Sequence, residues 1–237
     1  MRPGTRAKVT ERSVTGETVA EDRAVIFDMD GVLINSEPLH CQATQEILAL
    51  YGVTMSEADY FGRYIAYSDW EIMELLISEA SARPAAAQAK SRRYLELVGS
   101  GVPPFPDGLG LLMRTDGWRV ALATGSMRCE AELALTALGV RDRFQTIVTR
   151  EDCVNGKPDP EPFLRAAAGL GVQPTRCVVV EDSPGGVRAA KAAGMACVAV
   201  THSCPRDTLL EADLVVDDLA DVDLGAVLPA ARGSHAG

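Results

Sequence analysis

The distribution of apolar and polar positions first marks a short strand that ends at two acids. Ala24–Phe27 is apolar, with β-branched and aromatic residues, and it leads directly into Asp28 and Asp30. Such a run predicts a buried strand, and because an uncompensated carboxylate is costly to bury, we expect the strand to end at Asp28. Both acids should then lie at the carboxyl end of a strand, the edge at which ligands bind in open α/β sheets.

The following stretch, from Glu37 to about Val102, has apolar residues at helical spacing and no strand signal. Capping residues, prolines and glycines divide it into three predicted helices: Pro38 to about Tyr51, Asp69–Ala80 and Pro84–Val98. The segment Val102–Gly108 contains three prolines and one glycine in seven residues, which predicts a linker. The stretch is therefore expected to be a helical block between two linkers.

Strands and helices alternate after this linker. The predicted strands are Trp118–Thr124, Thr146–Thr149, Arg176–Val180, Ala196–Val200 and Asp213–Val216, and the predicted helices are Met127–Leu138, Glu161–Leu170 and Pro184–Ala193. Alternation of this kind predicts an α/β fold with a doubly wound parallel sheet. Because one strand precedes the helical block and the others follow it, we predict a Rossmann-like core at 23–36 and 104–226 with an inserted helical cap at 37–103. Residues 1–22 and 227–237 are predicted to be tails.

Composition narrows the class of protein and its partners. The 237 residues are 47% hydrophobic and 24% charged, as in an ordinary globular protein, and the net charge of −10 argues against nucleic acid or an anionic membrane as the main partner. No apolar run reaches the roughly 18 residues of a membrane-spanning helix, and the N-terminus lacks the apolar core of a signal peptide. The six cysteines form no CxxC pair, which favours reduced thiols and a cytoplasmic protein. We expect a monomer.

A second strand also ends at a pair of acids. The apolar run Val178–Val180 leads into Glu181 and Asp182, so that two strand ends in one sheet would place four carboxylates in one cleft. Their mutual repulsion requires a cation, and oxygen-only ligands favour Mg²⁺. Of the first pair, Asp28 and Asp30, one acid could attack as a nucleophile while the other moves protons. Both pairs could instead have only a structural role. Asp28 and Asp30 would then lie in an acidic turn, and Asp182 would cap the following helix.

Two further segments are suited to binding phosphate. Thr124 and Gly125 follow an apolar strand and precede a helix, whose free backbone N–H groups can face an anion. Lys157 lies in the turn-rich loop Asn155–Pro160, where its ammonium can act as a point charge for phosphate. The alternatives are that Ser126 only caps this helix and that Lys157, like most lysines, is solvated.

In combination, these segments resemble the four motifs of the haloacid dehalogenase (HAD) superfamily, in its phosphatase and phosphomutase branch. Asp28–Leu33 is similar to the first motif, Thr124 to the second, Lys157 to the third, and Glu181 with Asp182 to the fourth. The motifs occur in the family's order, and the resemblance covers about residues 23 to 220. The predicted helical insertion agrees with the helical-cap subclass of this family.

The resemblance implies Mg²⁺-dependent phosphoryl transfer through an aspartyl-phosphate on Asp28, with Asp30 as the acid and then the base. It implies that Asp28, Asp182 and the carbonyl of Asp30 bind the metal, with Glu181 as a ligand or a supporting group. The phosphoryl oxygens would be bound by Lys157, Thr124 and backbone N–H groups near Met29 and Gly125. A dehalogenase is not expected, because those members of the superfamily lack an acid at the position of Asp30.

The choice of reaction within the branch depends on the cap. The segment that contains His40 occurs in both phosphatases and mutases, so His40 does not distinguish them. Lys90 falls where mutases have a lysine for the sugar phosphate, although a lysine on a helix is expected to be solvated. Arg63 follows Gly62 directly in a loop that departs from the mutase signature, so that it could bind a distal anion or face solvent. We therefore expect hydrolysis of a small sugar or polyol phosphate. The alternatives are a mutase resembling β-phosphoglucomutase and a catalytically idle binding protein.

Overall fold

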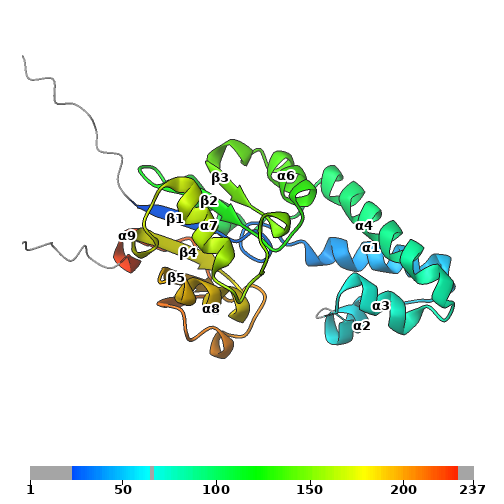
Figure 1. Ribbon diagram of the computed structural model, residues 1–237. Helices are drawn as coiled ribbons and strands as arrows, with labels where there is room; N and C mark the ends of the chain where they lie inside the picture. The colour runs from blue at the N-terminus through cyan, green and yellow to red at the C-terminus, as the bar shows by residue number, and fades with distance from the viewer. Residues whose placement is uncertain (1–22, 65–66, 229–237) are drawn as a thin grey trace, which may run out of the picture.

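The computed structural model describes residues 23–64 and 67–228, which form a sheet covered by helices and a helical block beyond one end of the sheet (Figure 1). The predicted N-terminal tail and residues 229–237 of the predicted C-terminal tail lie outside these described residues. The fold class predicted from the sequence is confirmed: the sheet is parallel and the helical block lies between its first and second strands.

Six parallel strands form the sheet in the order β3-β2-β1-β4-β5-β6. Their bounds are β1 Ala24–Phe27, β2 Arg119–Ala123, β3 Thr146–Val148, β4 Cys177–Glu181, β5 Ala196–Val200 and β6 Leu214–Val216. The central strand β1 pairs with both β2 and β4, and Phe27 lies opposite Leu122 on one side and Val180 on the other. Because the three strands run in the same direction in this register, the residues that follow them meet at one edge of the sheet.

Helices cover both faces of the sheet, which explains why the strands are almost entirely apolar. Val25 and Phe27 face the layer that holds α5 (Pro106–Met113), α6 (Arg128–Ala137) and α9 (Leu224–Val227). Ala24 and Ile26 face the opposite layer, with α7 (Glu161–Leu170) and α8 (Pro184–Ala192). The side chains of one strand thus alternate between two hydrophobic clusters, as the pleat of a strand requires.

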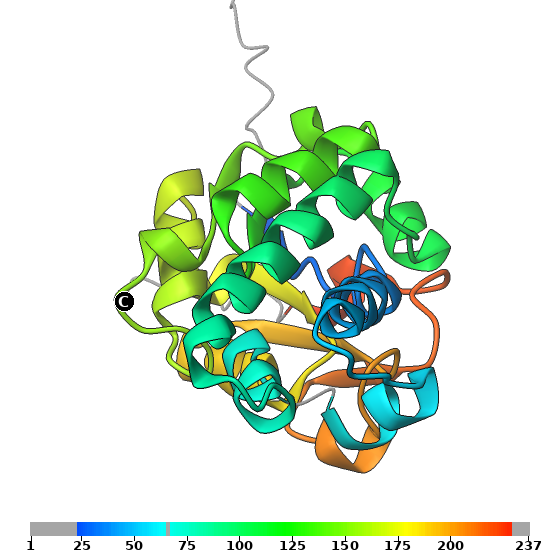
Figure 2. The ribbon, with the colours of Figure 1, turned by 90° about the vertical axis from the view of Figure 1, so that its right-hand side faces the viewer.

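The helical block lies beyond the carboxyl end of β1 and has a hydrophobic cluster of its own, which includes Leu48, Ile72 and Met73 (Figure 1). Its helices are α1 (Glu37–Leu50), α2 (Glu57–Asp59), α3 (Asp69–Leu76) and α4 (Arg83–Ser100), with a π-helix at Tyr60–Tyr64. Viewed from the side of the block, α1 and α4 lie in front of the sheet (Figure 2). Helix α4 packs against α1 and α3 and also contacts α6, so that the block adjoins the layer beside the sheet.

The two connections to the helical block are joined to each other. The backbone N–H of Asn35 donates to the carbonyl of Pro103 at 2.8 Å, and the N–H of Phe105 donates to the carbonyl of Leu33 at 2.9 Å. Ile34 and Pro104 form an antiparallel bridge between these bonds. The chain therefore leaves and re-enters the core through one short pair of hydrogen-bonded segments.

The predicted linker Val102–Gly108 is wrong in its second half, because α5 begins at Pro106. Proline is favourable in the first turn of a helix, where its missing N–H is not needed. Gly108 belongs to this helix and packs against the first connection, where an added Cβ would lie 1.9 Å from the carbonyl oxygen of Val32. The glycine thus permits a close contact between helix and loop.

Other predicted boundaries also differ from the structure. The helix expected over Asp69–Ala80 ends at Leu76, and Ile77 has an extended backbone and is buried. At the C-terminus, the tail was expected from residue 227, but Val227 is the last residue of α9 and Leu228 packs against the sheet cluster with it. In the part of the chain that the structure describes, the helices are too short or too polar to cross a membrane.

Candidate active site

The ends of β1 and β4 bring three carboxylates together. Asp28 follows β1, and its backbone N–H donates to the carbonyl of Val180 at 2.9 Å, which places it beside Glu181, the last residue of β4. Asp28, Glu181 and Asp182 are all buried, and each has a carboxylate oxygen within 4.8 Å of those of the other two. The structure thus brings together three of the four predicted acids through the register of two parallel strands.

Lys157 reaches this acid cluster (Asp28, Glu181 and Asp182) from the loop before α7. Its Nζ lies 2.7 Å from Oδ1 of Asp28 and 2.6 Å from Oε1 of Glu181, and 4.9 Å from the centroid of the Phe163 ring. The side chain is only 14% exposed, so it is not a solvated surface lysine. Burial alone would lower the pKa of this ammonium, but the charges of Asp28 and Glu181 outweigh burial and raise it.

The acid cluster has more negative charge than Lys157 can balance. Burial raises the pKa of Asp28 to about 7, with Glu181 and Asp30 adding to the rise and Lys157 opposing it. Burial and the charges of Glu181 and Asp28 likewise raise the pKa of Asp182 well above its usual value. For Glu181 burial also favours the neutral acid, but Lys157 and two backbone N–H groups hold its pKa below the usual value.

The donor set of the acid cluster fits a magnesium ion. Three carboxylates face one ammonium, and a divalent cation would offset the remaining charge. All of the candidate ligands are oxygen atoms, which hard cations such as Mg²⁺ prefer. Burial and the neighbouring carboxylates raise the pKa values of Asp28 and Asp182, as is expected when one ammonium faces three buried acids.

Asp30, the fourth predicted acid, lies between two hydroxyl groups. The hydroxyl of Ser36 donates to Oδ1 at 2.5 Å, and the hydroxyl of Ser126 donates to Oδ2 at 2.7 Å. Neither serine side chain caps a helix: Ser36 precedes α1 without a capping bond, and the residue before α6 is Met127. The capping role considered for Ser126 from the sequence is therefore wrong, because its hydroxyl binds Asp30.

The other predicted phosphate-binding residues lie at the ends of β1 and β2. Thr124 is buried directly after β2, and its Oγ1 accepts the backbone N–H of Ser126 at 3.0 Å, which leaves its hydroxyl hydrogen for another acceptor. Gly125 is exposed beside it. The side chain of Met29 is buried in the sheet cluster, so only its backbone could contact a phosphate.

His40 and Lys90 contact each other in the helical block. The expectation that Lys90 is solvated is wrong. Its side chain is 1% exposed, and its Nζ lies 2.6 Å from Oδ1 of Asp69 and 2.6 Å from Nδ1 of His40. His40 stacks on Tyr94 with ring centroids 3.8 Å apart. Burial and the Lys90 charge lower the pKa of His40 to about 3, so the imidazole is neutral and accepts from the ammonium. Lys90 is buried because α4 packs against α1 and α3.

Arg63 belongs neither to the acid cluster nor to the group of His40 and Lys90. Its side chain is 69% exposed and lies 3.7 Å from Asp59, one helical turn earlier in the chain. This geometry agrees with the expectation that Arg63 could face solvent.

Two residues that the sequence analysis did not consider lie against the acid cluster and its loop. Nδ1 of His202 lies 2.9 Å from the carbonyl oxygen of Gly31, and the Ser203 side chain hydrogen-bonds to Asp182. Both follow β5, the neighbour of β4 in the sheet. The signal was available: Thr201–Ser203 is a polar segment directly after an apolar strand.

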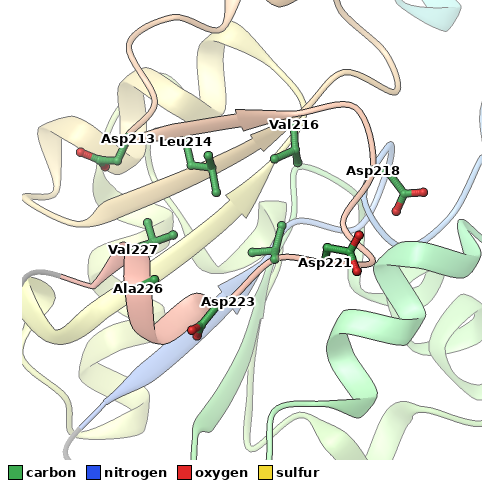
Figure 3. A pocket seen from close by; sticks show the side chains of 9 residues that line it. Asp213, Leu214, Val216, Asp218, Asp221, Asp223, Ala226 and Val227 are labelled. Carbon is green, nitrogen blue, oxygen red and sulfur yellow. The ribbon is translucent and has the colours of Figure 1, made fainter.

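A separate pocket lies at the outer edge of the sheet, between β6 and α9 (Figure 3). Its lining combines Asp213, Asp221 and Asp223 with apolar side chains such as Val216 and Val227, and none of its lining residues is basic. Because it contains no cation to bind a phosphate and shares no residue with the acid cluster, we do not assign the predicted chemistry to it.

Comparison with known protein families matches residues 25–200 to the haloacid dehalogenase-like hydrolases. The chain belongs to this family. The matched range contains both acid pairs, Thr124 and Lys157, and it spans the helical block as well as most of the sheet. The resemblance inferred from the four motifs is therefore confirmed.

The individual relatives of the chain include HAD-family phosphatases and a phosphomutase. It is 36% identical over 186 residues to fructose-1-phosphate phosphatase YqaB of Escherichia coli (strain K12), covering 74% of this chain and 95% of that protein. It is 32% identical to β-phosphoglucomutase of Bacillus subtilis (strain 168), covering 85% and 92%. The crystal structure of CbbY from Rhodobacter sphaeroides in complex with phosphate superimposes with a TM-score of 0.72 at 26% identity, covering 86% and 98%.

Proposed function

We propose that this HAD-family phosphatase hydrolyses a small sugar or polyol phosphate with the help of Mg²⁺, by transferring the phosphoryl group to Asp28. The observation that carries the proposal is the buried Asp28 carboxylate, which lies 2.7 Å from the Lys157 ammonium and within 4.8 Å of the oxygens of Glu181 and Asp182. Phosphoryl transfer needs a positioned nucleophile and concentrated positive charge more than it needs covalent chemistry from the protein, and this arrangement supplies both.

The acid cluster prepares Asp28 for attack. The carboxylate must be ionised, and Lys157 favours that form while burial opposes it. Mg²⁺, when bound, supplies further positive charge to the carboxylates and the phosphoryl oxygens. We assign Asp28, Asp182 and the carbonyl of Asp30 as its ligands. Glu181 is the supporting group, because Lys157 donates to its Oε1, and the N–H groups of Asp182 and Ser183 and the Ser183 hydroxyl donate to its Oε2.

Asp30 acts as the acid and then the base. It protonates the leaving oxygen of the substrate and afterwards removes a proton from the water that attacks the phosphorylated Asp28. The hydroxyls of Ser36 and Ser126 orient its two oxygens. Lys157, Thr124 and the backbone N–H groups near Met29 and Gly125 bind the phosphoryl oxygens. The contact of Lys157 with Asp28 and the position of Thr124 directly after β2 support these roles.

The helical block at 37–103 acts as a cap that carries substrate contacts from His40 and Lys90. Its position beyond the carboxyl edge and its contact through α4 and α6 support this role. A cap that closes over the site excludes water and bulky substrates, which favours a small metabolite over a phosphoprotein.

Charge balance around Lys90 favours a phosphatase over a mutase. The Lys90 ammonium is already paired with Asp69 at 2.6 Å, and its other close partner, His40, is neutral. This group therefore offers hydrogen bonds to hydroxyls but no surplus positive charge for a second phosphate. The mutase alternative keeps one observation in its favour, which is that Lys90 is buried beside His40 and so is not a solvated lysine.

The test is a single incubation of the protein with Mg²⁺ and a panel of sugar and polyol phosphates. The panel includes β-glucose 1-phosphate with a trace of the 1,6-bisphosphate, and both inorganic phosphate and glucose 6-phosphate are measured. We expect phosphate release without isomerised product. Glucose 6-phosphate without phosphate release would identify a mutase, and the absence of both products together with no Mg²⁺ binding in a titration would indicate an idle binding protein.

Two further parts of the proposal concern the state of the protein in the cell. The six cysteines are free thiols, which supports a cytoplasmic location. A monomer is our prediction, and light scattering coupled to size-exclusion chromatography measures it directly.

A further inference from the structure

His202 lies between the loop that carries Asp30 and the second connection to the helical block. Nδ1 is 2.9 Å from the carbonyl oxygen of Gly31, and Nε2 is 3.1 Å from Oδ2 of Asp107 in the first turn of α5. The ring stacks on Phe105, with centroids 4.0 Å apart and an interplanar angle of 10°. The imidazole thus touches the loop and the connection at the same time, and its side chain is only 12% exposed.

Both polar partners of the ring can only accept hydrogen bonds. A backbone carbonyl has no hydrogen to donate, and neither does an ionised carboxylate. Oδ2 of Asp107 also accepts the backbone N–H of Leu219 at 2.9 Å. A neutral imidazole has one N–H and can satisfy only one of the two partners, whereas an imidazolium satisfies both.

The surroundings of the ring favour hydrogen-bond donation by its nitrogens. The pocket beside it, next to α5, is lined by Asp107, Asp217, Asp218 and Arg114, so acids outnumber bases. A hydrogen bond donated to a carboxylate is charge-assisted, and such bonds are stronger and more directional than neutral ones.

A hydrogen bond to the Gly31 carbonyl can fix the position of Asp30. Gly31 follows Asp30 directly and has a φ of 76°, and its N–H donates to the carbonyl of Ile34 at 2.9 Å. A Cβ at this position would lie 1.7 Å from Oδ2 of Asp182 and 2.5 Å from Oγ of Ser203. The backbone of the loop is therefore packed tightly against the acid cluster, and a bond to the Gly31 carbonyl fixes the peptide next to Asp30.

We propose that His202 is a positioning residue for Asp30: its ring links the Gly31 carbonyl to Asp107 and so holds the Asp30 carboxyl group at the leaving oxygen of the substrate. The inference rests on the proposed function of Asp30 as the acid. It adds His202, which follows β5 and is not among the residues assigned to the phosphate or the metal, to the set that governs proton transfer.

The test compares two substrates that differ in their need for a proton. Glucitol 6-phosphate has an alkoxide leaving group that must be protonated, whereas p-nitrophenyl phosphate has a phenolate that leaves without one. For His202→Gln we expect kcat/KM to fall at least about tenfold with glucitol 6-phosphate and less than about threefold with p-nitrophenyl phosphate. The parameter kcat/KM is used because it reports the step in which the leaving group departs.

Two variants serve as controls. Asp107→Asn removes the charged partner of the ring, so it should produce the same selective loss, and the double variant should lose no more than the worse single variant because both changes break one connection. Thr201→Val alters the neighbouring residue, whose hydroxyl donates to Asp217 at 2.7 Å, and should leave both substrates unaffected. Should His202→Gln fail to fold, Asp107→Asn alone carries the test.

A second measurement reads the ring directly. The chain has three histidines, so ¹⁵N NMR with His202→Gln as the assignment control identifies the His202 signals. We expect the signal of the ring nitrogen that faces Asp107 to change in Asp107→Asn, because the ring contacts that carboxylate. Unchanged ring signals in that variant would overturn the inference.

The outcomes separate this inference from the proposed function. Equal losses with both substrates in His202→Gln and Asp107→Asn would mean that His202 only stabilises the fold, and no loss with either would remove its role entirely. A wild-type protein that hydrolyses neither substrate with Mg²⁺ would instead overturn the proposed function, and the inference with it.

Discussion

Two largely buried lysines, Lys157 in the core and Lys90 in the helical block, differ in what surrounds them. Each ammonium has two close partners, at 2.6–2.7 Å for Lys157 and 2.6 Å for Lys90. Lys157 lies between two carboxylates, with Asp182 as a third acid in the same cluster. Lys90 lies between one carboxylate, Asp69, and one imidazole. The first site therefore keeps excess negative charge, and the second is balanced.

This difference assigns different chemistry to the two regions. Excess negative charge in a buried site favours a bound cation. Burial, together with the neighbouring carboxylates, raises the pKa of Asp28 and Asp182. A balanced group has no such requirement and can bind the uncharged hydroxyls of a substrate. The core is thus suited to a metal and a phosphoryl group, and the helical block to the remainder of the substrate.

The largest effect is expected from Asp28→Asn. The amide cannot attack phosphorus, and loss of a nucleophile typically costs at least about 10³-fold in kcat. Steady-state kinetics with the best substrate of the panel measures this loss. Activity within tenfold of wild type would rule out Asp28 as the nucleophile, provided that circular dichroism confirms an unchanged fold.

The same variant should change how stability depends on pH in the metal-free protein. The pKa of Asp28 is about 7 in the folded protein and near 3.8 when unperturbed, so the folded state holds this proton more tightly. Its contribution to stability is present below pH 3.8 and is lost as pH rises to 7, by up to about 4 kcal/mol. Urea denaturation at several pH values should show a smaller decline for Asp28→Asn, and Mg²⁺ should stabilise the wild type more at pH 7 than at pH 5.

Lys157→Met is expected to have the next largest effect, on both activity and stability. It leaves Asp28 and Glu181 buried without their counter-charge, and removing one partner of a buried ion pair costs about 3–5 kcal/mol. We expect a loss of that order in unfolding free energy at pH 7, and a smaller difference from wild type at acid pH, where the carboxylates are protonated. Activity should fall about 10²-fold or more, since the charge on the phosphoryl group is no longer offset.

Lys191→Met is the matched control for this change. Lys191 also makes a short ion pair, 2.6 Å to Asp213, but its side chain is 34% exposed. Exposed pairs contribute at most about 1 kcal/mol, so this variant should be close to wild type in stability and activity. Equal losses in the two variants would contradict the distinction between a buried charge cluster and a surface pair.

Lys90→Met should have an intermediate effect and should be visible at His40. Without the adjacent ammonium, the pKa of His40 should rise from about 3 toward its usual 6.5, although burial still opposes protonation. In the wild type the neutral His40 contributes stability that is present above pH 6.5 and is lost as pH falls toward 3. The variant should lose less stability over this range, and NMR titration of His40 measures the shift.

The activity of Lys90→Met sharpens the comparison between the two lysines. We expect kcat/KM for the sugar phosphate to fall about tenfold, which is less than for Lys157→Met, because hydrogen bonds to substrate hydroxyls are lost and not the charge at phosphorus. A larger loss than that of Lys157→Met would show that the helical block binds a charged group and would favour the mutase.

The smallest effect is expected from Arg63→Ala. The side chain is 69% exposed, and its ion pair with Asp59 spans 3.7 Å on the surface. We expect changes within twofold in kcat/KM and within about 0.5 kcal/mol in stability. A tenfold rise in KM would instead assign Arg63 to a distal anion of the substrate.

Much of the fold followed from local patterns. The six strands, the helical block and the parallel sheet were predictable because each strand is a short apolar run and each change of element is marked by glycine, proline or capping residues. The sequence also marked both acid pairs, since a run of buried residues cannot continue through carboxylates. These features depend on residues that are close in the chain.

Other features depended on residues that are distant in the chain. The close contact between Gly108 of α5 and Val32 joins segments that are far apart in the chain, and no local pattern indicates it. Ser126 had a plausible role as a cap, but the fold places its hydroxyl, together with that of Ser36, against Asp30. Local competition between capping and long-range contacts cannot be resolved from spacing alone.

The sequence by itself determined which chemical groups are present and at which strand ends they occur: Asp28 after one strand, Glu181 and Asp182 after another, and Lys157 in a loop. Only the tertiary structure decided their surroundings. Strand register brings the three acids together, and helix packing buries Lys90 while Arg63 stays exposed. Burial and charge balance are properties of the whole neighbourhood of a residue, and that neighbourhood is assembled from segments that the sequence keeps far apart.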